Sequence, residues 1–414
     1  MNQIDAMLNE LCPAGVEYKP IGDIARLVRG NGMPKSDFSE AGVGCIHYGQ
    51  IYTYYGTWTT ETKSFIPPEK AARLAKVDPG DLVVTNTSEN IDDVCKAVAW
   101  LGDDQIVTGG HATVLKHDQD PKFLSYYLQT PQFFAEKKRH ATGTKVIDVS
   151  AKSLAKILVP VPPLEVQQKV VVILDSFTKL EAELEAELEA RRAQYRHYRD
   201  SLLSFERTGK QASKQARMIA RLGDLGKLTR GRRFTKEDYA SGGIGCIHYG
   251  DIYTSYGTSA TAAVSHVRAD MARSLRFAKP GDVVIAAVGE TVEDVGKAVA
   301  WLGDEDVAVH DDCFTFSHDQ NPKFVSYYLQ TSTFHAEKNR FVARAKVKRL
   351  SGESLARLTI PVPPREEQDR IVSILDKFDA LVNDLSSGLP AEIAARRRQY
   401  QHYRDRLLTF RQAA

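Results

Sequence analysis

The sequence has few cysteines and no long apolar segment. Its five cysteines, an odd number, include no Cys-x-x-Cys pair, which argues against a disulfide framework and favours reduced thiols in a cytoplasm. No apolar run approaches the roughly 18 residues that a membrane helix needs, and residues 1–5 lack the basic segment that opens a signal peptide. We therefore expect a cytoplasmic protein with no membrane partner.

The sequence also lacks a strong charge of either sign and any catalytic signature. The net charge is only +2, which neither requires nor excludes nucleic acid, because local clusters matter more than the total. There is no Asn-Pro-Pro-Tyr motif of amino-methyltransferases and no Rossmann glycine fingerprint. Residues 289–297 imitate a phosphate loop, but six residues separate the two glycines and Ala298 follows Lys297, so a turn is the better interpretation. We expect a chain that catalyses no reaction.

The sequence contains an internal duplication of one unit. Gly-Cys-Ile-His-Tyr-Gly at 44–49 recurs at 245–250, and Lys-Ala-Val-Ala-Trp-Leu-Gly-Asp at 96–103 recurs at 297–304. The offset is 201 residues in both cases, which is far longer than a solenoid repeat. The chain therefore holds two copies of a whole domain, and its function needs two similar sites.

Each copy is predicted to be mixed α/β. An aromatic stretch, 45–55 and 246–256, is expected to be largely strand, with alternate residues on opposite faces. Pro-Gly-Asp at 79–81 and 280–282 turns the chain into a valine-rich strand. Residues 96–101 alternate apolar and polar side chains, which is typical of a half-buried strand.

Two helical segments follow the copies. Residues 164–205 place apolar side chains seven apart, which is coiled-coil spacing. The second segment repeats this pattern but has four extra residues near 386–390, where Gly388 and Pro390 should break the helix. The simplest burial of these seams is against each other, antiparallel, in a pseudo-two-fold arrangement. The side chains expected in the helix–helix seam are Phe177, Leu184, Leu188, Tyr195, Tyr198, Phe378, Leu385, Tyr400 and Tyr403.

These boundaries define five parts of the chain. The two globular parts are 1–163 and 221–364, the two coiled-coil helices are 164–205 and 365–411, and residues 206–220 are a linker.

The motifs that follow each copy resemble a known family. Residues 360–368, 371–376 and 388–405 resemble the distal conserved region of type I restriction–modification specificity subunits, and 160–175 with 191–205 resemble their central conserved region. The tandem Glu-Leu-Glu-Ala unit near 180–188 is similar to that of the IC subfamily. The resemblance covers nearly the whole chain.

The resemblance implies a non-catalytic subunit of a restriction endonuclease and adenine methyltransferase complex. Two target-recognition domains would each read one half of a bipartite site in double-stranded DNA. The helices would dock two methyltransferase subunits, which restriction (translocase) subunits join. The chain itself would bind no cofactor; S-adenosylmethionine, ATP and Mg²⁺ are expected on the partners. Because the two domains are unusually alike, the half-sites should form an interrupted near-palindrome.

Basic clusters at matching positions in the two copies are the best candidates for DNA contact, since lysine and arginine contacts to phosphate supply most sequence-independent affinity. One pair of clusters surrounds Arg29 and Arg230, and the other includes Lys137 and Lys338. With aromatic and copy-specific positions added, the expected DNA-binding residues are Arg29, Lys35, Tyr48, Tyr54, His111, Arg139, Thr144, Lys145, Arg230, Arg232, Arg233, Tyr249, Asp312, Arg340, Arg344, Lys346 and Arg349.

The differences between the copies point to the base-reading loops. They cluster at 31–34 against 232–235, at 86–90 with 108–113 against 287–291 with 309–314, and at 141–144 against 342–345. Loops that vary on a kept scaffold are where base contacts would change, although drift in surface loops explains any single difference equally well.

Three alternatives stay open. Each basic residue alone could belong to an ordinary solvated surface. Cys45-x-His47 and Cys246-x-His248 could begin a metal site, but two more ligands are missing, so buried cysteine and hydrogen-bonded histidine are the better interpretation. The near-zero net charge fits a two-domain structural adaptor that binds proteins through a coiled-coil strut.

Overall fold

The computed structural model describes residues 2–205, 219–343, 347–384 and 387–413. The chain divides into two compact units, one of Met1–Glu183 with Ala394–Ala414 and one of Leu184–Ile393. Each unit therefore contains one copy of the repeat together with parts of the helices that follow both copies. No helix in the described part of the chain is long and apolar enough to cross a membrane.

The first unit is built on a five-stranded sheet of order β2-β11-β7-β9-β4 beside a four-stranded sheet of order β5-β3-β10-β6. Two short pairs, β1-β13 and β12-β8, complete it. The strands are β1 Tyr18–Pro20, β2 Ala25–Arg29, β3 Val43–Ile46, β4 Trp58–Thr59, β5 Ser64–Ile66, β6 Ala75–Val77, β7 Leu82–Thr85, β8 Thr87–Ser88, β9 Ala97–Trp100, β10 Ile106–Thr108, β11 Ala112–His117, β12 Ile147–Asp148 and β13 Leu158–Pro160. The helices are α1 Asn2–Leu11, α2 Ile21–Ile24, η1 Lys35–Asp37, α3 Tyr48–Thr53, α4 Pro68–Ala71, α5 Pro121–Tyr127, α6 Pro131–His140 and α7 Ala151–Leu154.

The second unit repeats this topology. Its sheets have the orders β15-β24-β20-β22-β17, β18-β16-β23-β19, β14-β26 and β21-β25. The strands are β14 Ile219–Arg221, β15 Gly226–Arg230, β16 Tyr239–Ile247, β17 Ser259–Ala260, β18 Ser265–Val267, β19 Phe277–Ala278, β20 Val283–Ala286, β21 Val288–Gly289, β22 Ala298–Trp301, β23 Val307–Val309, β24 Cys313–His318, β25 Lys348–Arg349 and β26 Thr359–Pro361. The helices are α10 Leu222–Leu225, η4 Lys236–Asp238, α11 Tyr249–Thr254, η5 Ala269–Ser274, α12 Pro322–Tyr328, α13 Ser332–Lys338 and α14 Gly352–Arg357.

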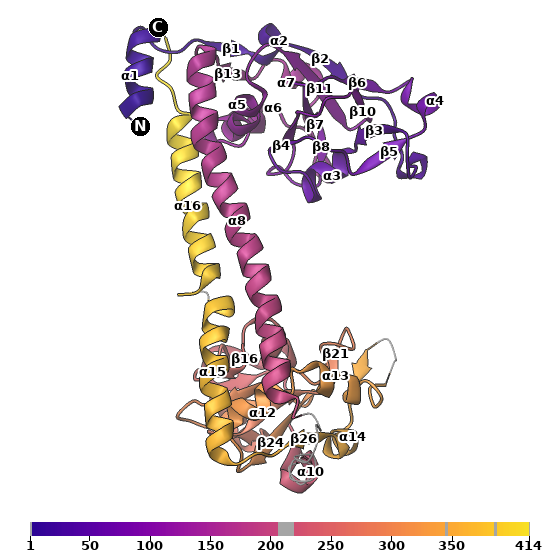
Figure 1. Cartoon of the computed structure of the whole chain (residues 1–414), viewed down its shortest axis with the longest axis vertical. Helices are drawn as coiled ribbons and strands as arrows, with labels where there is room; N and C mark the ends of the chain where they lie inside the picture. The colour runs from indigo at the N-terminus through magenta and orange to yellow at the C-terminus, as the bar shows by residue number, and fades with distance from the viewer. Residues whose placement is uncertain (1, 206–218, 344–346, 385–386, 414) are drawn as a thin grey trace. The chain divides into compact units, whose positions relative to one another are not determined.

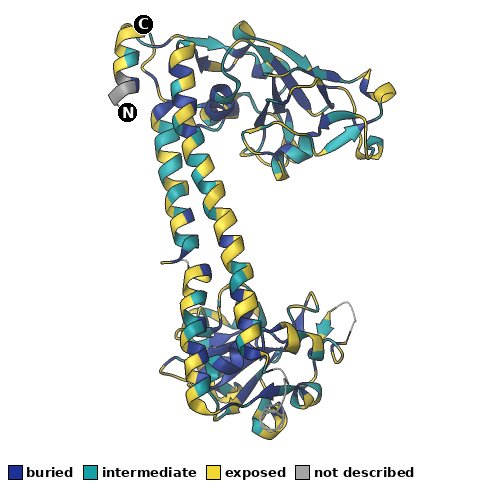
Figure 2. Cartoon of the chain, in the orientation of Figure 1, coloured by how far each residue is buried: buried dark blue, intermediate teal, exposed yellow. Residues whose placement is uncertain are grey.

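The central strands are buried on both faces, which corrects one prediction. All four residues of β9 are buried, so the strand that residues 96–101 form is not half-buried. Ala97 and Ala99 belong to the core cluster that contains α5, whereas Val98 and Trp100 belong to the cluster that contains Ile46 and Ile51. Both faces of the five-stranded sheet are therefore covered (Figure 2). The alternation of side chains along residues 96–101 does not mark a solvent-exposed face of this strand.

The aromatic stretch after β3 is a helix, which corrects a second prediction. Strand β3 ends at Ile46, and α3 begins at Tyr48 because His47 caps it. The Gly49 N–H donates to His47 Nδ1 at 3.1 Å, and the His47 N–H donates to Gln50 Oε1 at 3.2 Å. This reciprocal pair satisfies two amides at the start of the helix. Histidine is not among the favoured capping residues, and tyrosine and isoleucine favour strands, so sequence pattern alone favoured the wrong element.

The long helices pair antiparallel within each unit. Helix α8 runs from Leu164 to Leu203, α15 from Arg365 to Asn383 and α16 from Leu389 to Leu407 (Figure 1). In the first unit Phe177 stacks on Tyr403 at a centroid distance of 5.4 Å, and Arg397 Nε lies 2.5 Å from Glu181 Oε1. Since the later residue of α8 meets the earlier residue of α16, the helices run in opposite directions.

The second unit pairs α8 with α15 in the same way. Tyr198 stacks on Phe378 at 5.4 Å, and the Tyr195 hydroxyl donates to Asp379 Oδ1 at 3.2 Å. Leu188 is buried, and Leu184 packs against the same core. The first unit places Tyr400 beside Phe177. Leu385, the remaining predicted seam residue, lies outside the described residues.

Candidate nucleic-acid interface

One edge of the five-stranded sheet gathers the candidate residues of the first unit. Strand β2 ends at Arg29, β7 ends at Thr85, and β11 begins at Ala112. The register pairs Thr113 with Arg29 and Ala112 with Thr85. The residues just after β2, just after β7 and just before β11 therefore lie next to one another, although they are far apart in sequence.

The copy-specific loops meet at this edge. Asn86 Nδ2 donates to the Val149 carbonyl at 2.8 Å, and the Thr113 hydroxyl donates to Asn86 Oδ1 at 2.8 Å. Thr87 Oγ1 lies 2.9 Å from His111 Nδ1. Asn31 forms a β-bridge with Gly109, Thr142 bridges Asp148, and Asp148 pairs with Thr87. The three loop sets that differ between the copies thus form one continuous surface.

Most predicted residues of the first unit lie on or beside this surface. Arg29, Lys35, His111, Thr144 and Lys145 are exposed. Tyr48 is partly buried and packs on His111 with ring centroids 4.7 Å apart.

Two predicted residues make their contacts elsewhere. Tyr54 packs on Tyr55 and beneath the Lys63 ammonium, which is 4.4 Å from its ring. Arg139 Nη1 pairs with Glu136 Oε1 on its own helix at 2.5 Å.

The basic clusters contain two interior lysines, contrary to prediction. Lys137 is only 4% exposed, and its Nζ donates to the Asp92 and Val94 carbonyls at 2.7 Å each. Lys338 is fully buried, and its Nζ donates to the Val292 carbonyl at 2.5 Å. Burial lowers the pKa of both ammonium groups, that of Lys338 to about 8. These lysines hold the loop before β9 or β22 against α6 or α13, so they are not available to phosphate.

The corresponding edge of the second unit is more highly charged. Arg230 Nε donates to the Asp311 carbonyl at 2.7 Å, and its Nη2 lies 3.5 Å from Asp311 Oδ2. Arg349 Nη1 lies 3.8 Å from Asp312 Oδ1. Arg232, Arg233 and Arg340 are exposed, and Tyr249 packs on His248 at 4.2 Å. Arg344 and Lys346 lie outside the described residues.

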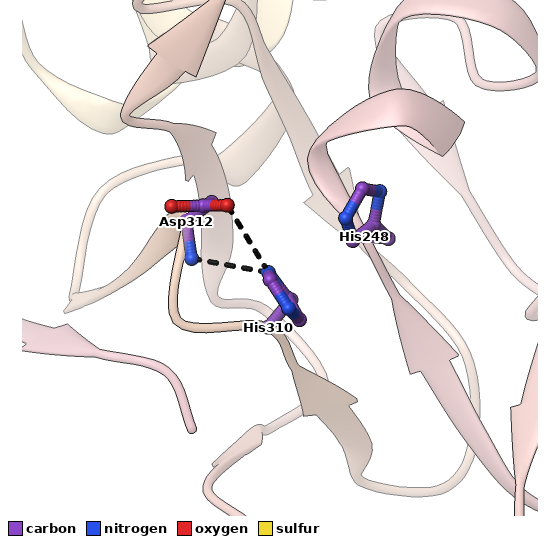
Figure 3. A group of neighbouring side chains, drawn as sticks. All are labelled: His248, His310 and Asp312. Carbon is purple, nitrogen blue, oxygen red and sulfur yellow. Dashed lines mark hydrogen bonds and ion pairs between the residues drawn. The ribbon is translucent and has the colours of Figure 1, made fainter. Parts of the chain in front are cut away.

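A group of possible metal ligands lies beneath this edge. The ligand atoms of His248, His310 and Asp312 lie within 4.8 Å of one another (Figure 3). However, His248 Nδ1 accepts the Gly250 N–H at 3.1 Å, and His310 Nδ1 accepts the Asp312 N–H at 3.2 Å. Each neutral ring then carries its proton on Nε2, which His310 directs to the Phe234 carbonyl at 3.1 Å. Coordination would have to break these hydrogen bonds, so the group serves better as a frame that holds the loops together.

Sequence reasoning did not single out four polar residues at this edge, of which Thr87 and Asp311 are partly exposed and Asn86 and His310 are buried. Asn86, Thr87, His310 and Asp311 are polar residues in the copy-specific loops, but no basic or aromatic pattern marked them individually. Comparison of the two copies marks the segments that contain all four, 86–90 and 309–314, but not the individual residues.

Comparisons with known proteins agree with this architecture. Residues 13–190 and 217–395 each match the family described as "Type I restriction modification DNA specificity domain". A putative type I restriction enzyme specificity subunit of Haemophilus influenzae is 28% identical over 410 residues, covering 95% of this chain and 96% of the relative. The EcoR124I/EcoR124II specificity subunit of Escherichia coli is 32% identical over 305 residues, covering 70% of each chain.

A solved structure supports the fold independently of sequence. It is described as the "structural basis underlying complex assembly and conformational transition of the type I R-M system", and one of its chains superposes with a TM-score of 0.63. The identity is 17%, and the match covers 95% of this chain and 97% of that one. With both repeats matched by the family and the fold shared, the chain belongs to the specificity subunits of type I restriction–modification systems.

Proposed function

We propose that this chain reads a bipartite site in double-stranded DNA, one half-site with each unit. The observation that carries the proposal is the sheet edge that occurs twice, with exposed arginine at matching strand ends, Arg29 and Arg230. Loops that differ between otherwise similar scaffolds meet at that edge in the first unit. A major groove presents a distinct donor and acceptor pattern for each base pair, and polar loops of this kind can read it.

The remaining parts of the proposal follow from family membership. The helices α8, α15 and α16 would dock two methyltransferase subunits, which restriction subunits join. The chain would contribute recognition and no covalent chemistry, while the partners would hold S-adenosylmethionine, ATP and Mg²⁺. The two edges share a scaffold and differ in their loops. Base pairs read by residues common to both units should therefore be the same in the two half-sites, which makes the site an interrupted near-palindrome.

Modification mapping of the host DNA tests the proposal directly. Methylated adenines should fall in a two-part motif with a spacer of constant length, and deletion of this chain should abolish the methylation. Two wholly unrelated half-sites would contradict the near-palindrome but not the bipartite reading. A methylation pattern that persists without this chain would contradict the function itself.

A protein-binding adaptor remains the second candidate, because the net charge is only +2. The two functions differ in their response to salt. DNA binding through phosphate contacts weakens steeply as salt rises, with a slope of about −0.9 for each contact. Salt-independent association with DNA, or none, by the full chain with its methyltransferase partners would favour the adaptor.

A further inference from the structure

Arg230 is held in a defined orientation at the sheet edge of the second unit. Its Nε donates to the Asp311 carbonyl at 2.7 Å, and its Nη2 faces Asp311 Oδ2 at 3.5 Å. Guanidinium has five N–H donors in a rigid plane. The hydrogen bond uses Nε–H and the ion pair lies on the same side of the group, so that among the described residues the Nη1 and Nη2 hydrogens form no other hydrogen bond. The free donors form the fork at the tip of the side chain.

The carboxylates lie beneath the arginines. The side chain of Arg230 is 52% exposed and that of Asp311 is 29% exposed. The same holds for the second pair, in which the side chain of Arg349 is 57% exposed and that of Asp312 is 21% exposed. Arg230, Asp311 and Arg349 line one pocket of about 600 Å³, whose walls include Phe314 and Phe341. Arg230 and Arg349 therefore line a common space, to which Asp311 also contributes, and each arginine is more exposed than its acidic partner.

The turn that carries both carboxylates is fixed from below. His310 accepts the Asp312 N–H (Figure 3). Its other ring nitrogen lies 3.1 Å from the Phe234 carbonyl. Arg276 Nη1 donates to the Arg230 carbonyl at 2.6 Å. Both sides of the Arg230–Asp311 pair are thus held by further hydrogen bonds, which reduces the entropy that the arginine would lose on binding a base.

The first unit has the arginine without this support. Arg29 occupies the position of Arg230, but Gly110 stands where Asp311 does, and His111 and Asp148 replace Asp312 and Arg349. Among the residues described in the first unit, Arg29 forms no ion pair, and its side chain is exposed. The arginine is common to both units, whereas its orienting carboxylate is specific to the second.

We propose that Arg230, oriented by Asp311, reads a guanine in the half-site bound by the second unit. Arg349, paired with Asp312, lines the same pocket beside Arg230. The inference rests on the proposed function and adds the base and the residue to it. The free fork matches guanine, whose O6 and N7 accept a bidentate pair from arginine in the major groove. Phosphate also accepts such a fork, but phosphate contact requires no fixed orientation within a pocket. The two half-sites should consequently differ at this position.

Substitution of Arg230 by lysine, which keeps the charge, tests the assignment. The full chain with its methyltransferase partners is assayed by modification mapping and by competition between oligonucleotides that differ at one base pair. Arg230→Lys should reduce discrimination for one guanine of one half-site by roughly 5- to 150-fold. Asp311→Asn should act at the same base with a smaller effect. Arg29→Lys is the matched control and should leave that guanine unaffected.

A change in the DNA tests the same contact without any change in the protein. Replacing the assigned guanine by 7-deazaguanine removes the N7 acceptor, which should weaken wild-type binding and leave Arg230→Ala binding unchanged, because alanine has no donor. A uniform loss of affinity for all sequences would identify a phosphate contact and overturn the assignment, as would an unchanged motif or the absence of guanine from that half-site. A wild-type complex with no sequence preference would instead overturn the proposed function.

Discussion

The buried lysine of the second unit should make the stability of that unit depend on pH. Lys338 is fully buried and donates to the Val292 carbonyl and to Asn339 Oδ1, at 2.5 and 3.1 Å. Burial lowers its pKa from 10.5 to about 8, and the repulsion of Lys297 acts in the same direction against the attraction of Glu293 and Asp294. The folded state therefore binds the proton more weakly than the unfolded state does.

The sign and size of the effect follow from proton linkage. Between the two pKa values the unfolded chain holds more protons than the folded one, so stability rises with pH in that range. With a folded pKa of about 8 and 1.36 kcal/mol for each pKa unit, Lys338 should add about 2 kcal/mol to the free energy of unfolding between pH 7 and pH 9.5. The contribution is absent at low pH, where both states are protonated.

Lys338→Met isolates this contribution from the other titrating groups. The variant cannot titrate at 338, and it leaves the Val292 carbonyl without its donor, which costs about 1–3 kcal/mol. At pH 7 this loss is offset by removal of the buried charge. At pH 9.5 the offset is largely gone. The free energy of unfolding of the wild type minus that of Lys338→Met should therefore be about 2 kcal/mol larger at pH 9.5 than at pH 7.

Urea unfolding can follow the second unit alone. The three tryptophans are Trp58, Trp100 and Trp301, so replacing the first two by phenylalanine leaves Trp301, in β22, as the only tryptophan, whose fluorescence is selected by excitation at a wavelength that tyrosine does not absorb. Lys279→Met, at an exposed lysine of the second unit, is the control and should show no such pH dependence. A stability difference between Lys338→Met and wild type that is equal at pH 7 and pH 9.5 would refute the linkage argument.

Three further predictions address the cap, the DNA surface and the helix length. His47→Ala should destabilise the first unit by about 1 kcal/mol through loss of the cap, and His47→Asn should recover most of it; equal unfolding midpoints for both variants would show that the cap contributes nothing. Lys145→Ala should weaken DNA binding by similar factors for all sequences and reduce the slope of affinity against salt by about 1; a sequence-dependent loss would instead mark Lys145 as a base-reading residue. Insertion of one Glu-Leu-Glu-Ala unit after Leu188 lengthens α8 by ~6 Å and should lengthen the tolerated spacer without altering either half-site in modification mapping; an unchanged spacer would exclude a measuring role for the helix.

Sequence pattern predicted some elements well and others poorly for identifiable reasons. The 40 residues of α8 were predictable because helix formers at heptad spacing act locally along one segment. The strand predicted around Tyr48 was wrong because a single side chain, His47, decides where β3 ends and α3 begins. The half-buried strand at 96–101 was wrong because a second sheet covers the face that its side-chain alternation marked as exposed.

By itself the sequence determined that this protein carries one domain twice, that a heptad pattern follows each copy, and where the copies differ. These are periodic or repeated properties that need no contact between distant residues to be recognised. Only the tertiary structure decided which of the differing residues work together. Asn86 meets Val149, and Arg230 meets Asp311, across 63 and 81 residues of chain. Lys338, on α13, is buried against the loop before β22, whereas Arg230, at the end of β15, is exposed, so place in the fold and not residue type decides which cation reaches solvent.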